Sequence, residues 1–296
     1  MKNEPIRHHY VPQFILRNFS NEKGFVNYYD KTINAVNLRE TRNVFMERNL
    51  YRDEINYTEN PTKVETDLAS FEREISQIMR EKFLVGDRIF LTKEEDEKLK
   101  LFFAIMGFRS YNTMFQFSKG MKRESVEMYS RYQSNEDFLD LWKRNLGYLI
   151  NCRSLEEVLN HKGIDEPIKL FMCRDVGGLW NQHWVVLEKK EGESFIIGDV
   201  YPTVVTGTIT QGFKIHIYSI NPISPSRVIL LVENGAENTP SHVLGFRQTV
   251  LYKPQWNSEK QIISIRVKKL YPEEVEIINN SVANAAQKGI VFYKDK

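Results

Sequence analysis

The stretch NQHWVVLEKKEGESFIIGDVYPTVV, residues 181–205, decides the fold class of this chain. It holds two runs of β-branched and aromatic residues separated by a polar Glu-Gly-Glu segment, which is typical of two strands joined by a turn. Residues 213–234 repeat the arrangement around a Pro-Ser turn, and residues 261–270 are either a further strand or a short extended segment. We therefore predict a strand-rich region over residues 167–271.

Upstream of this region, over residues 60–166, the periodicity is helical. In residues 60–84 apolar side chains recur at three- and four-residue steps from Val64 to Phe83, which predicts an amphipathic helix capped by Asn60 or Thr62. Thr92, followed by acidic residues, predicts the start of a second helix that runs to residue 117. Further helices are expected over residues 121–133, 135–150 and 154–163.

The two ends of the chain complete the predicted architecture. Residues 1–59 hold an N-terminal motif and a hairpin at 24–38, and residues 272–290 form a C-terminal helix that begins at a proline and two glutamates. We predict a single α+β domain over residues 1–296. In it, a helical body of about residues 60–160 and the C-terminal helix pack on a small, mostly antiparallel sheet.

Composition excludes several classes of protein. The chain has 41 Lys and Arg against 39 Asp and Glu, so no overall field attracts nucleic acid or an anionic membrane, although a local basic patch stays open. Two cysteines form no disulfide framework, and the N-terminus lacks the apolar run of a signal peptide. We expect a cytoplasmic protein without membrane association; its oligomeric state is left open.

Arg109 is the most unusual residue of the helical region. It follows Leu99, Phe102 and Met106 at helical steps, so it shares their apolar face. A guanidinium stays protonated in a protein, so a buried one needs anionic or carbonyl partners; alternatively, the side chain reaches water from the end of the apolar face. Glu65 and Glu72 lie two turns apart on the preceding helix and are candidate partners, although a solvated acidic face is the plainer interpretation.

A second group of polar residues flanks the predicted strands. Asp199 follows an apolar strand and a glycine, a position that suits a ligand, a base or a structural turn. His183 begins the preceding strand, so pairing of the two strands would bring it near Asp199. A histidine beside an aspartate suits a metal site, an acid–base couple or a simple hydrogen bond.

The opening sequence RHHYVPQFILRNFS, residues 7–20, places two histidines side by side. In extended backbone before a proline, consecutive side chains point to opposite sides. We therefore expect one of His8 and His9 to face a pocket while the other packs or binds backbone. Zinc signatures, a phosphate-binding loop, a dinucleotide fingerprint and a nucleophile elbow are all absent from the sequence.

Several segments resemble a bacterial family catalogued as domain of unknown function 4238. They are HHYVPQFILRNFS, VETDLASFEREISQI, GFRSYN, FIIGDVYPTVV, YSINPISPSRVILL and EIINNSVANAAQKGIVF, in the order the family has them. The resemblance spans nearly the whole chain and marks His8, His9, Pro12, Glu72, Arg109, Asp199 and Pro202. Where the family has Asp-Asn-Pro, this chain has Asp199-Val200-Tyr201-Pro202. The resemblance implies no reaction.

The candidate site residues suggest a hydrolase of the nuclease or phosphodiesterase type. Such an enzyme needs a base, an anion clamp and a proton donor, and a divalent ion such as Mg²⁺ or Mn²⁺ is an option. The catalytic candidates are His8, His9, Glu72, Arg109, His183 and Asp199, and the expected substrate is a nucleic acid or nucleotide. The alternative is a non-catalytic module that binds nucleic acid or protein, in which the same polar cluster is structural.

Overall fold

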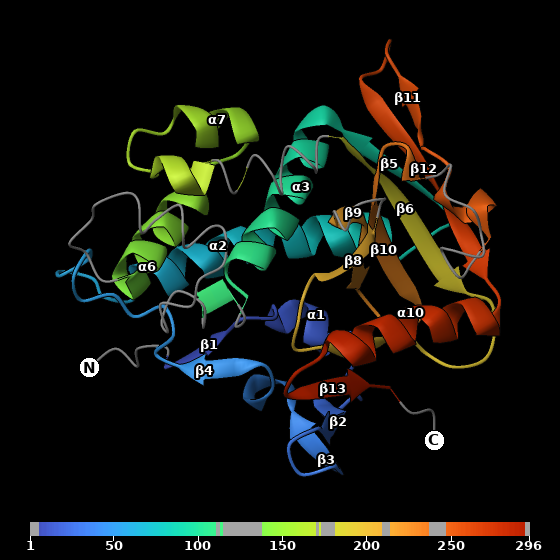
Figure 1. Cartoon of the computed structure of the whole chain (residues 1–296), viewed down its shortest axis with the longest axis horizontal. Coiled ribbons are helices and arrows are strands. Elements are labelled where there is room, and N and C mark those ends of the chain that lie inside the picture. Colours follow the sequence, from blue (N-terminus) through green and yellow to red (C-terminus); the bar gives the residue numbers. More distant parts are fainter. Residues whose placement is uncertain are drawn as a thin grey trace.

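We analysed a computed structural model of the chain, which describes residues 6–110, 113–114, 138–169, 172, 181–208, 214–236 and 247–293. The fold is α+β, as predicted (Figure 1). The predicted sheet size is wrong, because the principal sheet has seven strands and two further sheets have four and two. The pairing is mostly antiparallel, as expected, but the principal sheet is mixed because β12 runs parallel to β6.

The seven-stranded sheet is built around β6 (Gln182–Lys189), which lies between β12 (Ile262–Leu270) and β10 (Arg227–Glu233). The order continues from β10 through β9 (Lys214–Pro222) to β8 (Thr203–Thr208). At the other end, β12 pairs with both β11 (Gln255–Asn257) and β5 (Arg88–Thr92). Strand β5 lies within the region predicted to be helical.

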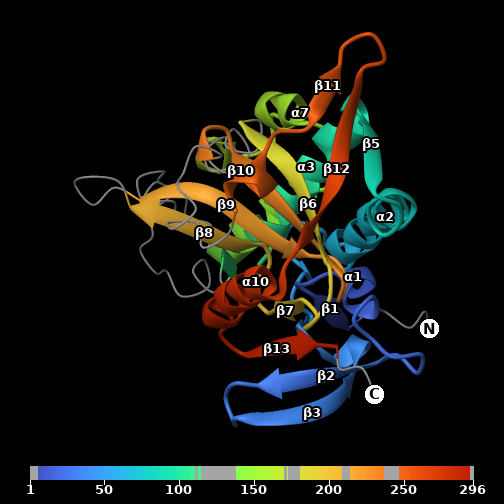
Figure 2. The ribbon, with the colours of Figure 1, turned by 90° about the vertical axis from the view of Figure 1, so that its right-hand side faces the viewer.

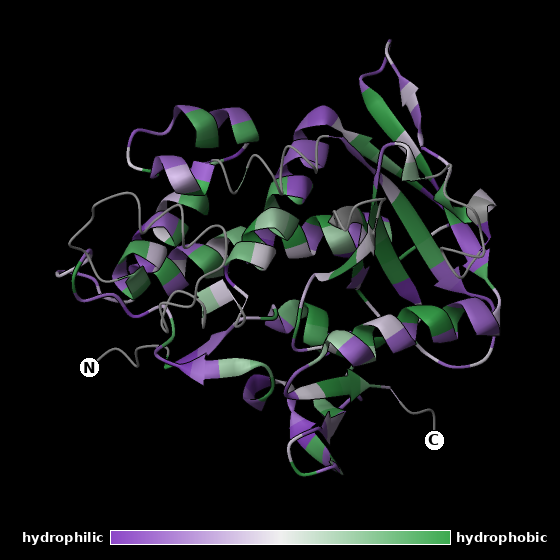
Figure 3. Ribbon diagram, in the orientation of Figure 1, coloured by the Kyte–Doolittle hydropathy of each residue, from purple (hydrophilic) through white to green (hydrophobic). Residues whose placement is uncertain are grey.

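Both faces of the central strands β6 and β10 are covered, which explains their continuous apolar runs (Figure 3). On β6, Trp184 and Val186 belong to the core shared with the helical region, whereas Val185 and Leu187 belong to a second core. Helix α10 (Pro272–Ala285) covers that second core through Val275, and Figure 2 shows it against the sheet. The sheet is therefore the middle layer between two groups of helices.

The predicted hairpin over residues 181–205 does not form. Strand β7 (Ile196–Gly198) leaves the principal sheet and joins a four-stranded sheet of order β3-β2-β13-β7. Strand β6 instead takes β10 and β12 as neighbours, because a strand buried on both faces needs a central position.

The four-stranded sheet joins the two ends of the chain. The hairpin predicted at 24–38 forms β2 (Phe25–Asp30) and β3 (Ala35–Glu40), and β2 pairs with β13 (Gly289–Phe292). The C-terminal helix therefore ends at Ala285 rather than at residue 290, and Gly289 starts a strand. A two-stranded sheet pairs β1 (Arg7–His9) with β4 (Met46–Arg48).

The helical region supplies most of the layer on the face of the principal sheet opposite α10. Helix α2 (Lys63–Ile78) continues as the π-helical segment η2 (Met79–Phe83) and buries the predicted apolar face. Thr92 caps α3 (Lys93–Phe108) with a capping box, as predicted, but α3 ends well before residue 117. The remaining described helices are α1 (Gln13–Arg17), η1 (Thr41–Asn43), α6 (Phe138–Leu149), α7 (Leu155–Asn160) and η4 (Gln248–Leu251). The helix predicted at 121–133 lies outside the described residues. Within the described ranges, no helix is both long and apolar enough to cross a bilayer.

Candidate functional site

A pocket of about 380 Å³ lies where the N-terminal segment meets helix α2 and the end of α3. Its lining residues come from β1, α1, η1, α2 and the C-terminal cap of α3, with one residue preceding β1. They are Ile6, Arg7, His9, Gln13, Arg42, Glu65, Leu68, Ala69, Glu72 and Arg109. Three of the predicted site residues, His9, Glu72 and Arg109, therefore share one cavity.

The two histidines separate as strand geometry requires. His9 lines the pocket, whereas His8 is fully buried behind it. The His8 ring stacks on Tyr51 with ring centroids 5.5 Å apart, and its Nδ1 accepts a 2.8 Å hydrogen bond from the Tyr51 backbone N–H. His8 therefore ties the first strand to the helical body.

His9 is held as a neutral imidazole. Its Nε2 lies 3.3 Å from the carbonyl oxygen of Thr41, and because a carbonyl only accepts, Nε2 carries the proton. Burial lowers the pKa of His9 to about 4, with the nearby positive charges of Arg109 and Arg17 acting in the same direction. At neutral pH His9 therefore keeps a lone pair on Nδ1, as a general base requires.

Arg109 forms the buried wall of the pocket and is 1% exposed. Its Nη2 lies 2.5 Å from Glu72 Oε1, so the predicted charge contact between the two helices forms and the solvent-exposed alternative for Arg109 is wrong. Among the described residues, Nε of Arg109 donates no hydrogen bond, so the contact with Glu72 is the main compensation of this buried charge. A guanidinium that lines a cavity places a fixed positive charge there, which suits an anionic ligand.

Glu65 also lines the pocket. The sequence offered it as a candidate partner of Arg109 or as part of a solvated acidic face. Burial raises its pKa to about 8, and the neighbouring carboxylate of Glu72 adds to the shift, while Arg109 opposes it. Glu65 is therefore a protonated acid at neutral pH. The sequence does place Glu65 two turns before Glu72 on the same helical face. Its protonation state, however, depends on burial, which the sequence does not show.

The charge balance of the pocket at neutral pH is positive. Glu65 is neutral, Glu72 is balanced by Arg109, and Arg7 and Arg42 remain at the pocket. Arg42 also forms an ion pair with Glu40, so Arg7 supplies most of the excess charge. The pocket therefore favours an anionic ligand.

The donor set does not fit the divalent ion considered from sequence. Within the described part of the chain, no group of three His, Cys, Asp or Glu side chains could hold a metal ion. In the pocket, Glu72 faces a guanidinium and Glu65 holds a proton, whereas Mg²⁺ and Mn²⁺ favour ionised carboxylates.

Comparison with known proteins identifies a family. The family described as "Protein of unknown function (DUF4238)" matches residues 7–296. The chain belongs to the DUF4238 family. No curated protein and no solved structure matches the chain.

The DUF4238 family motif at the N-terminus builds the pocket. His9 lines it, His8 supports it from behind, and Pro12 is the N-cap of helix α1. Glu72 and Arg109, which the resemblance also marked, complete one wall. Five of the seven positions therefore lie in or beside one cavity.

Asp199 and Pro202, the other two family positions, lie away from the pocket lining. Asp199 is 2% exposed, and its carboxylate accepts backbone hydrogen bonds from Gln287, Lys288 and Gly289 at 2.9, 3.0 and 3.3 Å. It thereby fixes the loop that leads from α10 into β13. The peptide between Tyr201 and Pro202 is cis.

His183 lies neither near Asp199 nor in the pocket lining. Its Nε2 is 2.6 Å from the Leu251 carbonyl oxygen, and its Nδ1 is 3.3 Å from Asn234 Oδ1. The expected proximity to Asp199 is wrong, because β6 and β7 belong to different sheets. The contacts of both residues indicate structural roles, and their assignment as catalytic residues stays a prediction.

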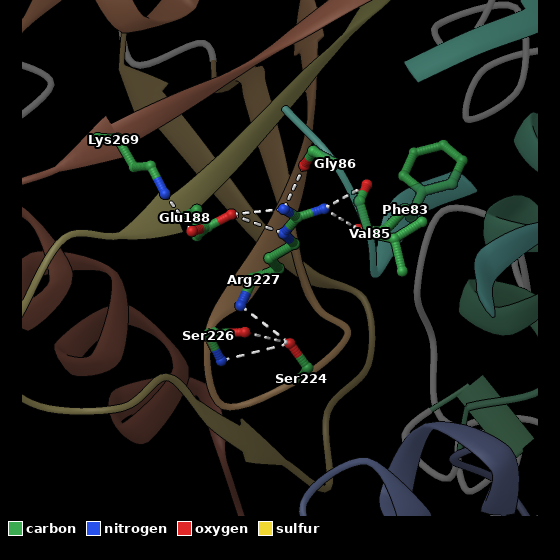
Figure 4. Close-up of polar contacts among 8 residues, drawn as sticks. All are labelled: Phe83, Val85, Gly86, Glu188, Ser224, Ser226, Arg227 and Lys269. Atoms are coloured by element: carbon green, nitrogen blue, oxygen red, sulfur yellow. Dashed lines mark hydrogen bonds and ion pairs between the residues drawn. The ribbon is translucent and has the colours of Figure 1, made fainter. Parts of the chain in front are cut away.

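The turn of residues 222–227, also part of the family resemblance, holds a second buried arginine for comparison (Figure 4). Arg227 donates to the carbonyl oxygens of Phe83, Val85 and Gly86 and, through Nε and Nη2, to Glu188 at 2.8 and 2.5 Å. All three of its guanidinium nitrogens are therefore bonded. Arg109, by contrast, contacts one carboxylate, that of Glu72, and lines a pocket.

Proposed function

We propose that this protein is a phosphodiester hydrolase that works without a metal ion and acts on a nucleotide or nucleic acid. The observation that carries the proposal is that His9, Glu65 and Arg109 line one pocket, in which the pKa values of His9 and Glu65 are shifted in opposite directions. His9 is a neutral base and Glu65 is a protonated acid at the same pH. Titratable neighbours whose pKa values are driven apart are typical of acid–base catalysis.

Each pocket residue has a role in the proposed reaction. Arg109, which lines the pocket, attracts the phosphoryl group through its positive charge and stabilises the charge that develops on its oxygens. His9 Nδ1 takes a proton from water as the oxygen attacks phosphorus. Glu65 gives its proton to the leaving alcohol oxygen, so that one water and one diester become a monoester and an alcohol. Exchange with solvent then restores both groups.

The remaining residues keep these groups in place. Thr41 accepts the His9 Nε2 proton and fixes the tautomer, and Glu72 holds the Arg109 side chain against the pocket. Tyr51, stacked on His8, donates its hydroxyl to the His9 carbonyl oxygen at 3.2 Å. These contacts orient the reacting groups without touching the substrate.

The proposal is tested by release of nitrophenolate from bis(4-nitrophenyl) phosphate and by cleavage of a labelled single-stranded oligonucleotide, each with and without EDTA. We expect turnover that persists in EDTA and falls at least about a hundredfold in H9A, E65Q and R109M. E74Q, on the same helix, and H161A are matched controls that should retain activity. Equal loss in the controls, or activity that needs an added divalent ion, would contradict the proposal.

The non-catalytic alternative draws support from the same ion pair. Buried Arg109 and its partner Glu72 also suit a pocket that only binds an anion. A nucleotide that binds in calorimetry and is never hydrolysed, with binding lost in R109M, would favour this alternative.

A further inference from the structure

Strands β5, β12 and β11 form a three-stranded ribbon that extends from the principal sheet (Figure 2). Residues opposite each other in an antiparallel ladder share a face. Arg88 pairs with Arg266, and both Phe90 and Gln255 pair with Ser264, so these five residues lie on one face of the ribbon. We call these five residues the ribbon face.

The two faces of the ribbon differ in burial. On the inner face, Ile89, Leu91 and Ile265 are at most 2% exposed and belong to the core shared with the helices. On the ribbon face, Phe90 is 51% exposed, and both arginines are exposed. A large aromatic ring thus stands in water on a sheet whose other side is already packed, so burial of the core does not account for it.

The two arginines of the ribbon face are directly opposite each other. Like charges in this arrangement destabilise a sheet. In the described parts of the chain, neither Arg88 nor Arg266 has an ion pair or hydrogen bond through its side chain that would offset this repulsion. An anion bound between the two guanidinium groups would offset the repulsion.

A hollow of about 890 Å³ lies over the ribbon, and its lining residues Phe90 and Ser264 are two residues along their strands from Arg88 and Arg266. Its lining combines the exposed ring of Phe90 with the polar side chains of Gln255, Asn257 and Ser264, and Trp256, which is 48% exposed, also borders it. Glu259 and Lys260 of the hairpin turn contribute one charge of each sign. The hollow therefore offers stacking and hydrogen bonding, and Arg88 and Arg266 add positive charge on the same face of the ribbon.

We propose that the ribbon face binds single-stranded nucleic acid. A base stacks on Phe90, the amide side chains contact base edges, and Arg88 and Arg266 hold the adjacent phosphates. A duplex does not fit this chemistry, because its bases are stacked on one another. A protein partner would favour an apolar centre with few charges, whereas here two like charges lie opposite each other beside the exposed Phe90 ring. The hollow on the ribbon and the pocket share no lining residue, and β11 lies on the other side of the molecule from β1 (Figure 1), so the proposal does not rest on the proposed hydrolase activity.

The test measures binding of fluorescein-labelled dT20 and U20 to the full chain by fluorescence anisotropy at several salt concentrations. F90A should weaken binding about tenfold, and F90W should restore it. R88Q/R266Q should also weaken binding and lower the salt slope by about 1.4, because two phosphate contacts are lost, whereas F90A should leave the slope unchanged. A matched blunt duplex should bind much more weakly than either single strand.

Two controls separate the ribbon face from the general surface. L38A removes an apolar side chain that is 61% exposed on another sheet, and R73Q/R80Q removes two exposed arginines of the α2–η2 segment; both should bind as the wild type does. Equal affinity of F90A and wild type, equal binding of the duplex, or a change of oligomeric state in F90A would overturn the proposal. Hydrolysis of bis(4-nitrophenyl) phosphate, followed in the same variants, should not change.

Discussion

Arg109 Nη2 lies 2.5 Å from Glu72 Oε1, and the two partners differ strongly in exposure: the arginine side chain is 1% exposed and the glutamate side chain 18%. Removal of Glu72 and removal of Arg109 should therefore lower the free energy of unfolding by different amounts. Without Arg109, Glu72 can still be hydrated from the pocket. Without Glu72, a guanidinium that cannot be deprotonated stays buried, and Glu65 can replace the lost counter-charge only by giving up its proton.

We therefore predict that E72A destabilises the protein more than R109M does. Leaving a buried charge without its partner costs about 3–5 kcal/mol, whereas methionine fills much of the arginine volume without charge. Urea unfolding of the two variants and of E72A/R109M measures the effect. The double variant should be more stable than E72A alone, and a double variant less stable than both singles would contradict the argument.

The partnership between α2 and α3 could be predicted from sequence because both helices have strong periodicity. Phe102, Met106 and Arg109 share a helical face, and Glu65 and Glu72 share another. Local spacing determines which side chains point together on one element. It does not determine how deeply they are buried, so the raised pKa of Glu65 and the burial of Arg109 became visible only in three dimensions.

The pH dependence of the proposed reaction follows from His9 and Glu65. The base must be neutral and the acid protonated, so activity should be lost below about pH 4 and above about pH 8. The dependence of kcat/KM on pH should therefore be a plateau between these limits. E65Q should lose the alkaline limb together with most of the rate, whereas E74Q should keep both limbs. A limb near pH 6.5 would indicate a histidine other than the buried His9.

Glu65 also predicts a pH dependence of stability. Its pKa rises from about 4.5 to about 8 on folding, so the folded chain holds a proton that the unfolded chain releases in this range. The contribution of Glu65 is full below about pH 4.5 and is lost as pH rises towards 8. The stability of E65Q relative to the wild type should therefore increase from pH 5 to pH 8 in thermal unfolding. Both the wild type and E65Q contain His9, so its titration contributes nearly equally to the two stabilities and largely cancels in their difference. A constant difference would contradict the pKa shift.

Substitution of Asp199 should lower the stability of the fold and leave the pocket intact. Its carboxylate accepts three backbone N–H groups in the loop before β13, and alanine would leave these donors unpaired. We expect D199A to lose about 3 kcal/mol in urea unfolding and D199N to lose less, because an amide oxygen still accepts. The affinity of the folded variants for a nucleotide should not change. A selective loss of binding or turnover in D199N at full stability would instead support the catalytic role predicted from sequence.

Long-range pairing accounts for the main errors of sequence reasoning. The five residues of β5 alternate between exposed and buried, but they directly precede the strong cap of α3, and their partner β12 lies 170 residues later in the chain. The apolar runs of β6 and β7 are separated by a good turn, yet they join different sheets. Strand propensity is local information, whereas the choice of neighbour depends on which faces other elements cover.

Arg227 holds the segment before β5 against β6, and its contribution to the local stability of that segment can be measured. Its guanidinium binds three carbonyl oxygens of residues 83–86, directly before β5, and Glu188 on β6 (Figure 4). R227K keeps the charge but cannot reach all these acceptors, so we expect the loss of about 2–4 kcal/mol in unfolding. Because the lost contacts hold the start of β5, amide hydrogen exchange should increase first in residues 83–92 and much less in β2 and β3. K288Q, which removes a more exposed cation on the far sheet, is the matched control and should leave residues 83–92 protected. A uniform increase across the chain in R227K would show that the arginine stabilises the fold as a whole rather than this segment.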